Sequence, residues 1–358
     1  MKLFQQLLVA PAALGLLAPL SVSASEVNFD DISTYSNDNL EIDVNSFNQK
    51  STNNLLAGGE GLVDSSDTIG GFSETTTASF GVDFVVGAED GAASEAAAFG
   101  YQMGIGLSTS FTGEDSLDVA IDIGDGTSGA LAFDDTSDVL TVDGLTYTFP
   151  VGGATVMVGD STDISGVYTG ACAYSSFTDY MGNCGTGSTV GVGGSGVTAA
   201  MSYAFDSGFS LAGGVSSDPT SILTEEGTDI FGIEAAYTAD SYGLALAYSD
   251  AEATTGWGIN GMYAFDFATL SAGWESVDSG TTADGFFVGL SFPEVGPGTF
   301  DVGMGTTGNF SSSDTEYYIY EASYAYPIND GMTITPGVFI KEGTTDQTGV
   351  AVKTSFSF

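Results

Sequence analysis

The sequence predicts an all-β fold, a transmembrane antiparallel β-barrel of about 16 strands with a long in-folded loop. Three observations predict this fold. Apolar and polar residues alternate in segments of about 8–14 residues, which is the pattern of strands with two different faces. Very short turns edged by aromatic residues join these segments in pairs. The chain also ends in an alternating strand whose last residue is Phe358.

The composition excludes several other classes of protein. The 358 residues include 47 acidic and 4 basic side chains and no histidine, for a formal net charge of −43. A nucleic-acid-binding protein neutralises phosphates with Lys and Arg, so nucleic acid is not an expected partner. Without histidine, His-dependent catalysis and His-ligated metal sites are excluded. We therefore expect no enzyme activity, no cofactor and no bound metal.

Residues 1–24 have the features of a secretory signal peptide. One lysine precedes an apolar run from Leu7 to Leu20, and the small residues up to Ala24 fit a cleavage site. Residues 25–73 are polar and lack sustained periodicity, so we expect a periplasmic segment there. The alternating pattern then continues through 74–358, which is the predicted barrel.

Alternation is clear in single segments of the chain. Tyr101, Met103, Ile105 and Leu107 share one parity, and polar or small residues occupy the other. The same pattern fits a soluble sandwich, in which the apolar parity would face a shared core. The aromatic residues decide between the two, because a membrane barrel carries aromatic girdles at its interfaces and a sandwich has no such need. Between the short turns we expect longer, more acidic connections.

Counting back from the carboxyl terminus gives an even number of strands, as a closed single-chain barrel requires. A barrel of sixteen strands is too wide to be filled by its own side chains and leaves an aqueous channel. The predicted strands are 74–87, 97–111, 116–123, 139–149, 153–160, 197–206, 208–216, 229–238, 241–250, 256–265, 268–276, 284–292, 298–305, 315–326, 330–341 and 347–358.

Charged residues within the predicted strands fall on the polar parity. A charge facing lipid is costly, so we expect these side chains to line the pore. Unopposed carboxylates in a lumen attract cations and repel anions. The predicted pore-lining residues are Asp118, Asp122, Glu234, Glu275, Asp301, Glu321, Lys341 and Lys353.

The two cysteines and the terminal phenylalanines carry further predictions. In an exported chain, Cys172 and Cys184 are expected to form a disulfide. The alternating end VAVKTSFSF, with Phe356 and Phe358 on one parity, resembles the assembly signal of outer-membrane barrel proteins. That resemblance implies the barrel-assembly machinery as a partner.

Several segments together resemble a known family. MKLFQQLLVAPAALGLLAP, FSETTTASFGVDFVVGAEDG, GYQMGIGLSTSFTGEDSL and LTVDGLTYTFPVGGATVMVGD are similar to porins of marine unicellular cyanobacteria, which are related to the carbohydrate-selective porin family. The resemblance implies a trimeric sixteen-stranded channel in the cell outer membrane that passes ions and small solutes. We do not expect the S-layer homology domain usual in that family, because 25–73 is too short for it and lacks its pattern. The basic residues around the family's pore are missing too, so sugar or anion specificity is not carried over.

The longest predicted connection runs from about 161 to 196. In trimeric general porins the corresponding loop folds into the barrel and sets the constriction. By that analogy, the constriction loop here contains Tyr168, Cys172, Tyr174, Asp179, Tyr180 and Cys184. A cap over the outer mouth of the barrel is the alternative.

Two functional hypotheses follow from the sequence. The first is a porin that allows passive, cation-preferring diffusion of ions and small hydrophilic solutes. The second is a structural or surface barrel whose lumen is plugged by 161–196 or by 25–73. Conductance separates the two hypotheses.

Overall fold

The computed structural model describes residues 76–91, 96–126, 136–178, 184–190, 196–224, 227–306 and 316–358. All of them belong to the compact unit Gly61–Phe358. The predicted signal peptide 1–24 and the polar segment 25–73 lie outside the described residues, as do Asp179 and Tyr180 of the long connection.

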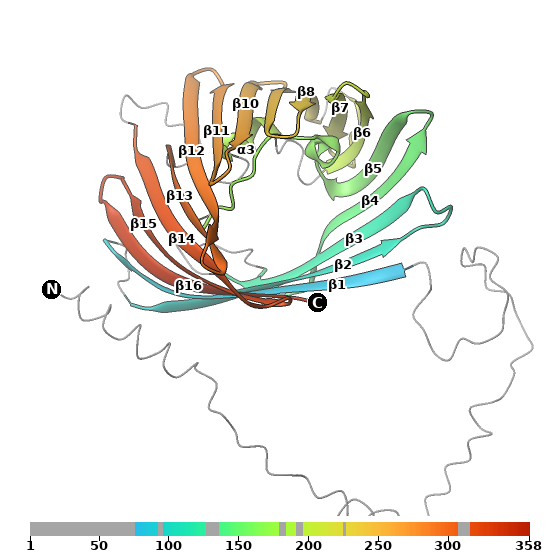
Figure 1. Cartoon of the computed structure of the whole chain (residues 1–358). Helices are drawn as coiled ribbons and strands as arrows, with labels where there is room; N and C mark the ends of the chain where they lie inside the picture. The colour runs from blue at the N-terminus through green and yellow to red at the C-terminus, as the bar shows by residue number, and fades with distance from the viewer. Residues whose placement is uncertain are drawn as a thin grey trace, which may run out of the picture. The chain divides into compact units, whose positions relative to one another are not determined.

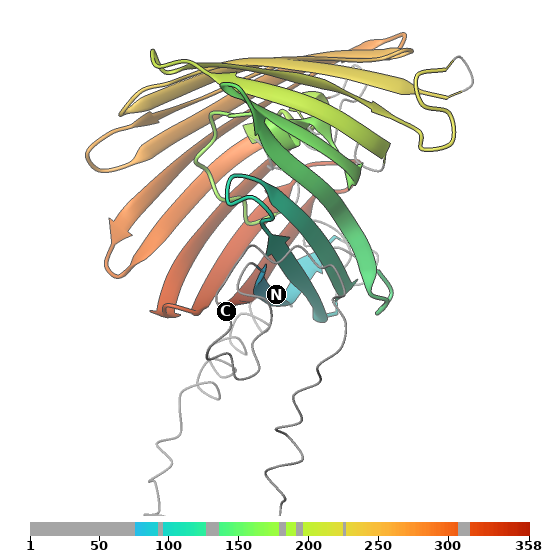
Figure 2. The same ribbon diagram turned by 90° about the vertical axis from the view of Figure 1, so that its right-hand side faces the viewer.

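The described residues form sixteen antiparallel strands in one closed barrel, so the predicted sixteen-stranded antiparallel β-barrel is confirmed (Figure 1). Each strand pairs with its neighbours in the sequence, and β1 pairs with β16 to close the ring. Figure 2 shows that the strands run obliquely within the barrel wall that they form. The strands are β1 Thr76–Asp90, β2 Ala98–Thr109, β3 Ser116–Asp125, β4 Thr141–Val151, β5 Ala154–Thr162, β6 Gly196–Ala204, β7 Phe209–Ser217, β8 Asp229–Thr238, β9 Tyr242–Ala251, β10 Thr254–Ala264, β11 Thr269–Asp278, β12 Thr282–Val295, β13 Gly298–Thr306, β14 Tyr318–Asn329, β15 Met332–Lys341 and β16 Gln347–Ser357.

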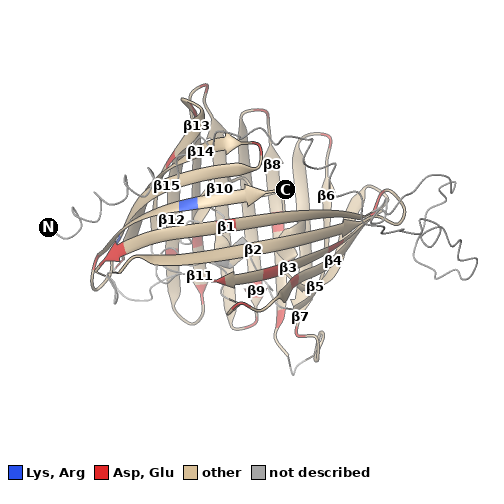
Figure 3. Cartoon of the chain, turned by 90° about the horizontal axis from the view of Figure 1, so that it is seen from below, with Lys and Arg blue, Asp and Glu red and all other residues tan. Residues whose placement is uncertain are grey.

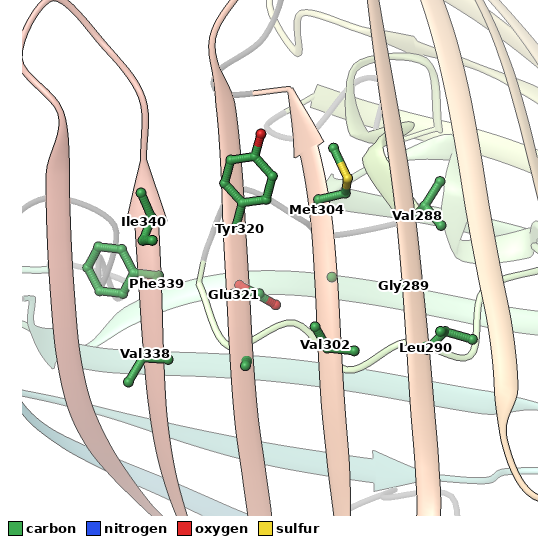
Figure 4. Close-up of a pocket in the computed structure, with 12 residues that line it drawn as sticks. Val288, Gly289, Leu290, Val302, Met304, Tyr320, Glu321, Val338, Phe339 and Ile340 are labelled. Carbon is green, nitrogen blue, oxygen red and sulfur yellow. The ribbon is translucent and has the colours of Figure 1, made fainter.

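The two faces of the wall differ as the alternation predicts. In β9, Leu244 and Leu246 are 50% and 46% exposed, whereas Ala245 and Ala247 are each 2% exposed. A large apolar side chain left exposed in this way suits contact with lipid rather than water. Figure 4 shows the same alternation in β14 and β15, where Tyr320 and Ile340 point away from the side taken by Glu321 and Phe339. Among the described residues, no helix is long and apolar enough to cross a membrane.

Aromatic side chains form a belt at the end of the barrel that carries the short turns. The rings of Tyr203 and Phe205 lie 4.7 Å apart, as do those of Phe209 and Tyr237. Further along the belt, Phe265 stacks on Phe267 with centroids 5.8 Å apart. Aromatic rings are favoured at the boundary between hydrocarbon and headgroups, because they have an apolar body and a polarisable or polar edge.

Two of the connections expected to be long are short. β9 and β10 are joined only by Glu252 and Ala253, and β11 and β12 only by residues 279–281. Glu252 has a φ of 59° and Gly280 a φ of 89°, which lets the chain reverse within two or three residues. The strands therefore extend further toward this end than their alternation indicated.

The closing seam is held at the carboxyl terminus. The N–H of Phe80 donates to the carbonyl of Phe358 over 2.8 Å, and the N–H of Phe358 donates back over 3.0 Å. The two rings are stacked with centroids 5.5 Å apart. Further into the seam, the ring of Phe356 meets the ring of Phe84 edge to face. The last residues of the chain thus pair directly with the first strand.

The turn between β2 and β3 is organised by Asp115, which is 7% exposed. Its carboxylate accepts hydrogen bonds from the Tyr147 phenol, the Ser110 hydroxyl and the backbone N–H of Phe111 and Thr112. These bonds, that of Tyr147 first, hold the pKa of the Asp115 carboxyl well below its ordinary value. The turn is therefore built around an ionised carboxylate.

This carboxylate makes stability depend on pH in a defined direction. Because its pKa is lower in the folded state, Asp115 stabilises the fold above its unfolded-state pKa of 3.8, and that contribution is lost as the pH falls below 3.8. Asp115→Asn is expected to be less stable than wild type at pH 7 and to lose less stability on acidification. Urea unfolding in detergent at pH 7 and at pH 3 measures the difference. Equal acid sensitivity of the two proteins would contradict the assignment.

Candidate functional site

The connection between β5 and β6 carries the candidate site. We call its described residues, 163–178 and 184–190, the inner segment. It contains the 3-10 helix η4 Ile164–Val167 and the short helix α3 Gly187–Val190, and Figure 1 draws α3 within the ring of strands. The predicted disulfide is confirmed, since Cys172 and Cys184 are bonded with their Cα atoms 5.8 Å apart.

The inner segment begins with a turn that is fixed to the wall. The side chain of Asp163 caps η4 by accepting from the N–H of Ser165. Ile164 is fully buried and packs in one cluster with Met157 of β5 and Ala200 of β6. Burying such a side chain contributes about 1.5–3 kcal/mol. This apolar contact sets the direction in which the segment leaves β5.

The next residues donate hydrogen bonds to side chains of the barrel wall. The backbone N–H groups of Thr169 and Gly170 donate to Glu234 of β8, over 2.6 and 3.2 Å to one oxygen. The N–H of Ala171 donates to Oδ1 of Asn260 in β10 over 2.8 Å. The segment therefore runs along the wall with its backbone donors turned toward the strands.

Glu321 of β14 accepts four hydrogen bonds from the inner segment. One of its oxygens accepts from the Tyr174 hydroxyl over 2.9 Å and from the N–H of Phe177 over 2.8 Å. The other accepts from the N–H of Thr178 over 2.8 Å and from its hydroxyl over 2.6 Å. Burial, and then the charge of Glu321, raise the pKa of Tyr174, so its phenol stays protonated and remains a donor.

The returning limb of the segment is held in the same way. Thr189 donates from its N–H and from its hydroxyl to one oxygen of Glu275 in β11, over 3.0 Å in each case. The amide nitrogen of Asn260 donates to the hydroxyl of Thr186 over 3.1 Å. Asn260 thus contacts both limbs, since its oxygen accepts from Ala171.

Glycines on the same face of the wall make room for the segment. A Cβ at Gly273 would overlap the carbonyl of Cys184, and one at Gly337 would meet the ring of Phe177 at 2.5 Å. Gly273 faces Asn260 and Phe287 across the sheet, so it belongs to the inner face. Absence of a side chain at these positions allows the backbone of the segment to approach the strands closely.

The structure places all eight predicted pore-lining side chains on the inner face. The strand pairing shows that the two lysines face inward. Lys353 lies between Val85 and Thr335 of the neighbouring strands, and Lys341 lies opposite Ile319, all three of which are buried. Their role in lining a pore stays a prediction.

Four of these residues need a correction. Glu234, Glu275, Asp301 and Glu321 are only 2–3% exposed, so they do not border open water. Three of them are covered because the inner segment donates hydrogen bonds to them. Asp301 makes no such bond to the segment, and its Oδ1 has no partner.

On β1–β4, several acidic side chains of the inner face are less buried, although Val85 and Glu89 of β1 are buried. The inner face of β1–β4 lines two adjoining hollows of about 390 and 300 Å³, bordered by Asp118, Asp122, Asp83 and Asp143. Gln102 donates to Asp83 over 3.3 Å. Figure 3 shows acidic residues in red near these strands, and blue on the strand beside β1.

The prediction from sequence omitted several residues of this site. Asp83 lies on the polar parity of β1, so its alternation with Val82 and Phe84 could have identified it. Asn260 and Ser271 also lie on polar parities, and Ser271 accepts from the N–H of Ala173 over 3.1 Å. Neither is charged, so the cost of placing a charge against lipid gives no signal for them.

Comparisons with known proteins agree with this architecture. Residues 143–347, more than half of the chain, match a family model described as Gram-negative porin. OprB of Pseudomonas putida superposes with a TM-score of 0.64 at 14% identity, over 79% of this chain and 94% of that chain. A triple-mutant porin of Rhodopseudomonas blastica gives a TM-score of 0.55 at 16% identity, over 79% and 100%. A solved structure described as "Asymmetric conductivity of engineered proteins" gives a TM-score of 0.56 at 17% identity, over 79% of this chain and 100% of that chain. No curated protein matches the chain in sequence.

Proposed function

The chain belongs to the Gram-negative porin family, and on that premise we propose that it is a passive, cation-preferring channel for ions and small hydrophilic solutes. The observation that carries the proposal is the group of partly or fully exposed aspartates on β1–β4. Four aspartates border the hollows on the inner face of these strands, and the only basic residues of the strands are Lys341 and Lys353 of β15 and β16. A solute that passes along this face meets a negative field.

The inner segment supports a constriction beside that face. It hydrogen-bonds to β8, β10, β11 and β14, and the aspartates that border the hollows stand on other strands, β1–β4. A narrow passage strengthens the effect of each carboxylate, because low-dielectric walls concentrate the field. We propose that solutes pass between the inner segment and the aspartates of β1–β4.

Reversal potentials across planar bilayers test the selectivity. With a tenfold gradient of KCl, a cation-preferring channel makes the dilute side positive, because potassium crosses the membrane more readily than chloride. The preference is expected to weaken at 1 M salt, where the screening length falls to about 3 Å. An anion-preferring potential would contradict the proposal, and the absence of any conductance would favour a plugged structural barrel.

Assembly is part of the proposal. The resemblance to cyanobacterial porins leads us to propose a homotrimer that is exported with residues 1–24 as a signal peptide and inserted by the barrel-assembly machinery. We propose that carbohydrates cross the channel only as small neutral solutes that diffuse passively, without a dedicated sugar-binding site. Migration on a gel before and after boiling tests the oligomer, and a monomer in both lanes under mild detergent would contradict it.

A further inference from the structure

We propose that Glu234, Glu275 and Glu321 are positioning residues that set the bore of the channel. They hold the inner segment against the wall, and the sign of the selectivity comes instead from the aspartates of β1–β4. This inference rests on the proposed function, because bore and selectivity are properties of a channel. It assigns two different roles to carboxylates that the sequence presents as one group.

The inner segment needs acceptors for its backbone. Apart from η4 and α3 it has no regular structure, so its N–H groups lack the partners that a strand or helix would supply. Irregular backbone at membrane depth is tolerated where the surrounding protein satisfies it. Here the N–H groups of Thr169, Gly170, Phe177, Thr178 and Thr189 all donate to the three glutamates.

A carboxylate is suited to this task because both of its oxygens accept and neither donates. Glu321 accepts four hydrogen bonds, two at each oxygen. An amide at this position would turn an NH₂ group toward two of the four donors. Hydrogen bonds to a charged acceptor are also stronger than those to a neutral one. Glutamine in place of Glu321 therefore removes two bonds and brings donors face to face.

The same contacts reduce the influence of the three charges on a passing ion. The positive ends of the N–H dipoles point at each carboxylate, which opposes the field that it projects. The inner segment also lies between Glu321, which is 3% exposed, and the water of the lumen. Asp122 differs in that it is only partly buried and borders a hollow.

The chain offers a matched control in Asp301. It lies on the inner face of β13, one strand from Glu321, and is likewise 3% exposed. It accepts no hydrogen bond from the inner segment, and its Oδ1 has no partner. Asp301→Asn therefore removes one buried negative charge without removing a contact that holds the segment.

The experiment compares Glu321→Gln, Asp301→Asn and Asp122→Asn as refolded full-length channels in planar bilayers. Glu321→Gln is expected to raise single-channel conductance and open-channel noise, admit larger sugars in liposome swelling, and leave the cation-to-anion permeability ratio unchanged. Asp301→Asn is expected to keep the wild-type conductance. Asp122→Asn is expected to lower the cation-to-anion permeability ratio about twofold and to change the conductance little. This is the effect of one negative charge on a passing ion at a distance of about 8 Å in water.

Two outcomes would overturn the inference. One is a fall in the permeability ratio of Glu321→Gln as large as that of Asp122→Asn, with unchanged conductance. The other is an equal effect of Asp301→Asn and Glu321→Gln, which would make charge rather than hydrogen bonding the cause. Thr178→Val removes a donor from the segment and leaves the wall intact, so it should raise noise even if Glu321→Gln fails to fold. A wild-type protein without conductance would refute the proposed function instead.

Discussion

Replacing Gly273 by alanine is expected to narrow the channel. A Cβ at this position would overlap the carbonyl oxygen of Cys184 and lie 3.2 Å from a methyl carbon of Thr186. The strand cannot retreat, because β11 is paired on both sides with β10 and β12. The inner segment must therefore move away from the wall and toward β1–β4, which reduces the free cross-section. Single-channel conductance should fall.

The same substitution should also destabilise the barrel. Overpacking of this kind costs about 1–3 kcal/mol, which urea unfolding in liposomes can measure. Gly81→Ala is the matched control, since Gly81 is also an inner-face strand residue but has no atom within 4 Å of the position of its added Cβ. Unchanged conductance in Gly273→Ala would show that the segment does not rest on β11.

Alanine at Phe80 and alanine at Phe358 are expected to weaken barrel closure to a similar extent in vitro. The two residues exchange backbone hydrogen bonds across the seam and their rings stack. An aromatic pair contributes about 0.5–1.5 kcal/mol beyond the area that it buries, and either substitution removes it. Refolding into liposomes, followed by gels before and after boiling, measures the fraction of closed barrels.

In cells the two variants should differ. Phe358 is the terminal residue of the proposed assembly signal, whereas Phe80 is remote from the terminus in sequence, so Phe358→Ala should lower the amount of inserted protein much further. Phe267→Ala serves as the control, because Phe267 is 71% exposed in the aromatic belt but lies on the far side of the strand order from the seam. Equal insertion of the Phe80 and Phe358 variants in cells would leave closure as the only role of the terminal phenylalanine.

The strands could be predicted closely because their signal is local. Whether Leu244 faces outward and Ala245 inward depends on a two-residue period that every strand repeats. The errors fell where a turn overrode the pattern, as at Glu252, whose positive φ allows a shorter connection than the acidic residues around it indicated. Turn geometry at a single residue leaves little trace in an alternating sequence.

By itself, the sequence determined the strand number, the two faces of the wall, the closing strand and the pairing of Cys172 with Cys184. The tertiary structure decided which inner carboxylates the segment covers. Glu321 and Asp122 share the polar parity of their strands, yet Glu321 accepts from Thr178, 143 residues earlier in the chain, and Asp122 borders an open hollow. Strand alternation is a property of neighbouring residues, whereas contact between a loop and a distant strand exists only once the barrel has closed.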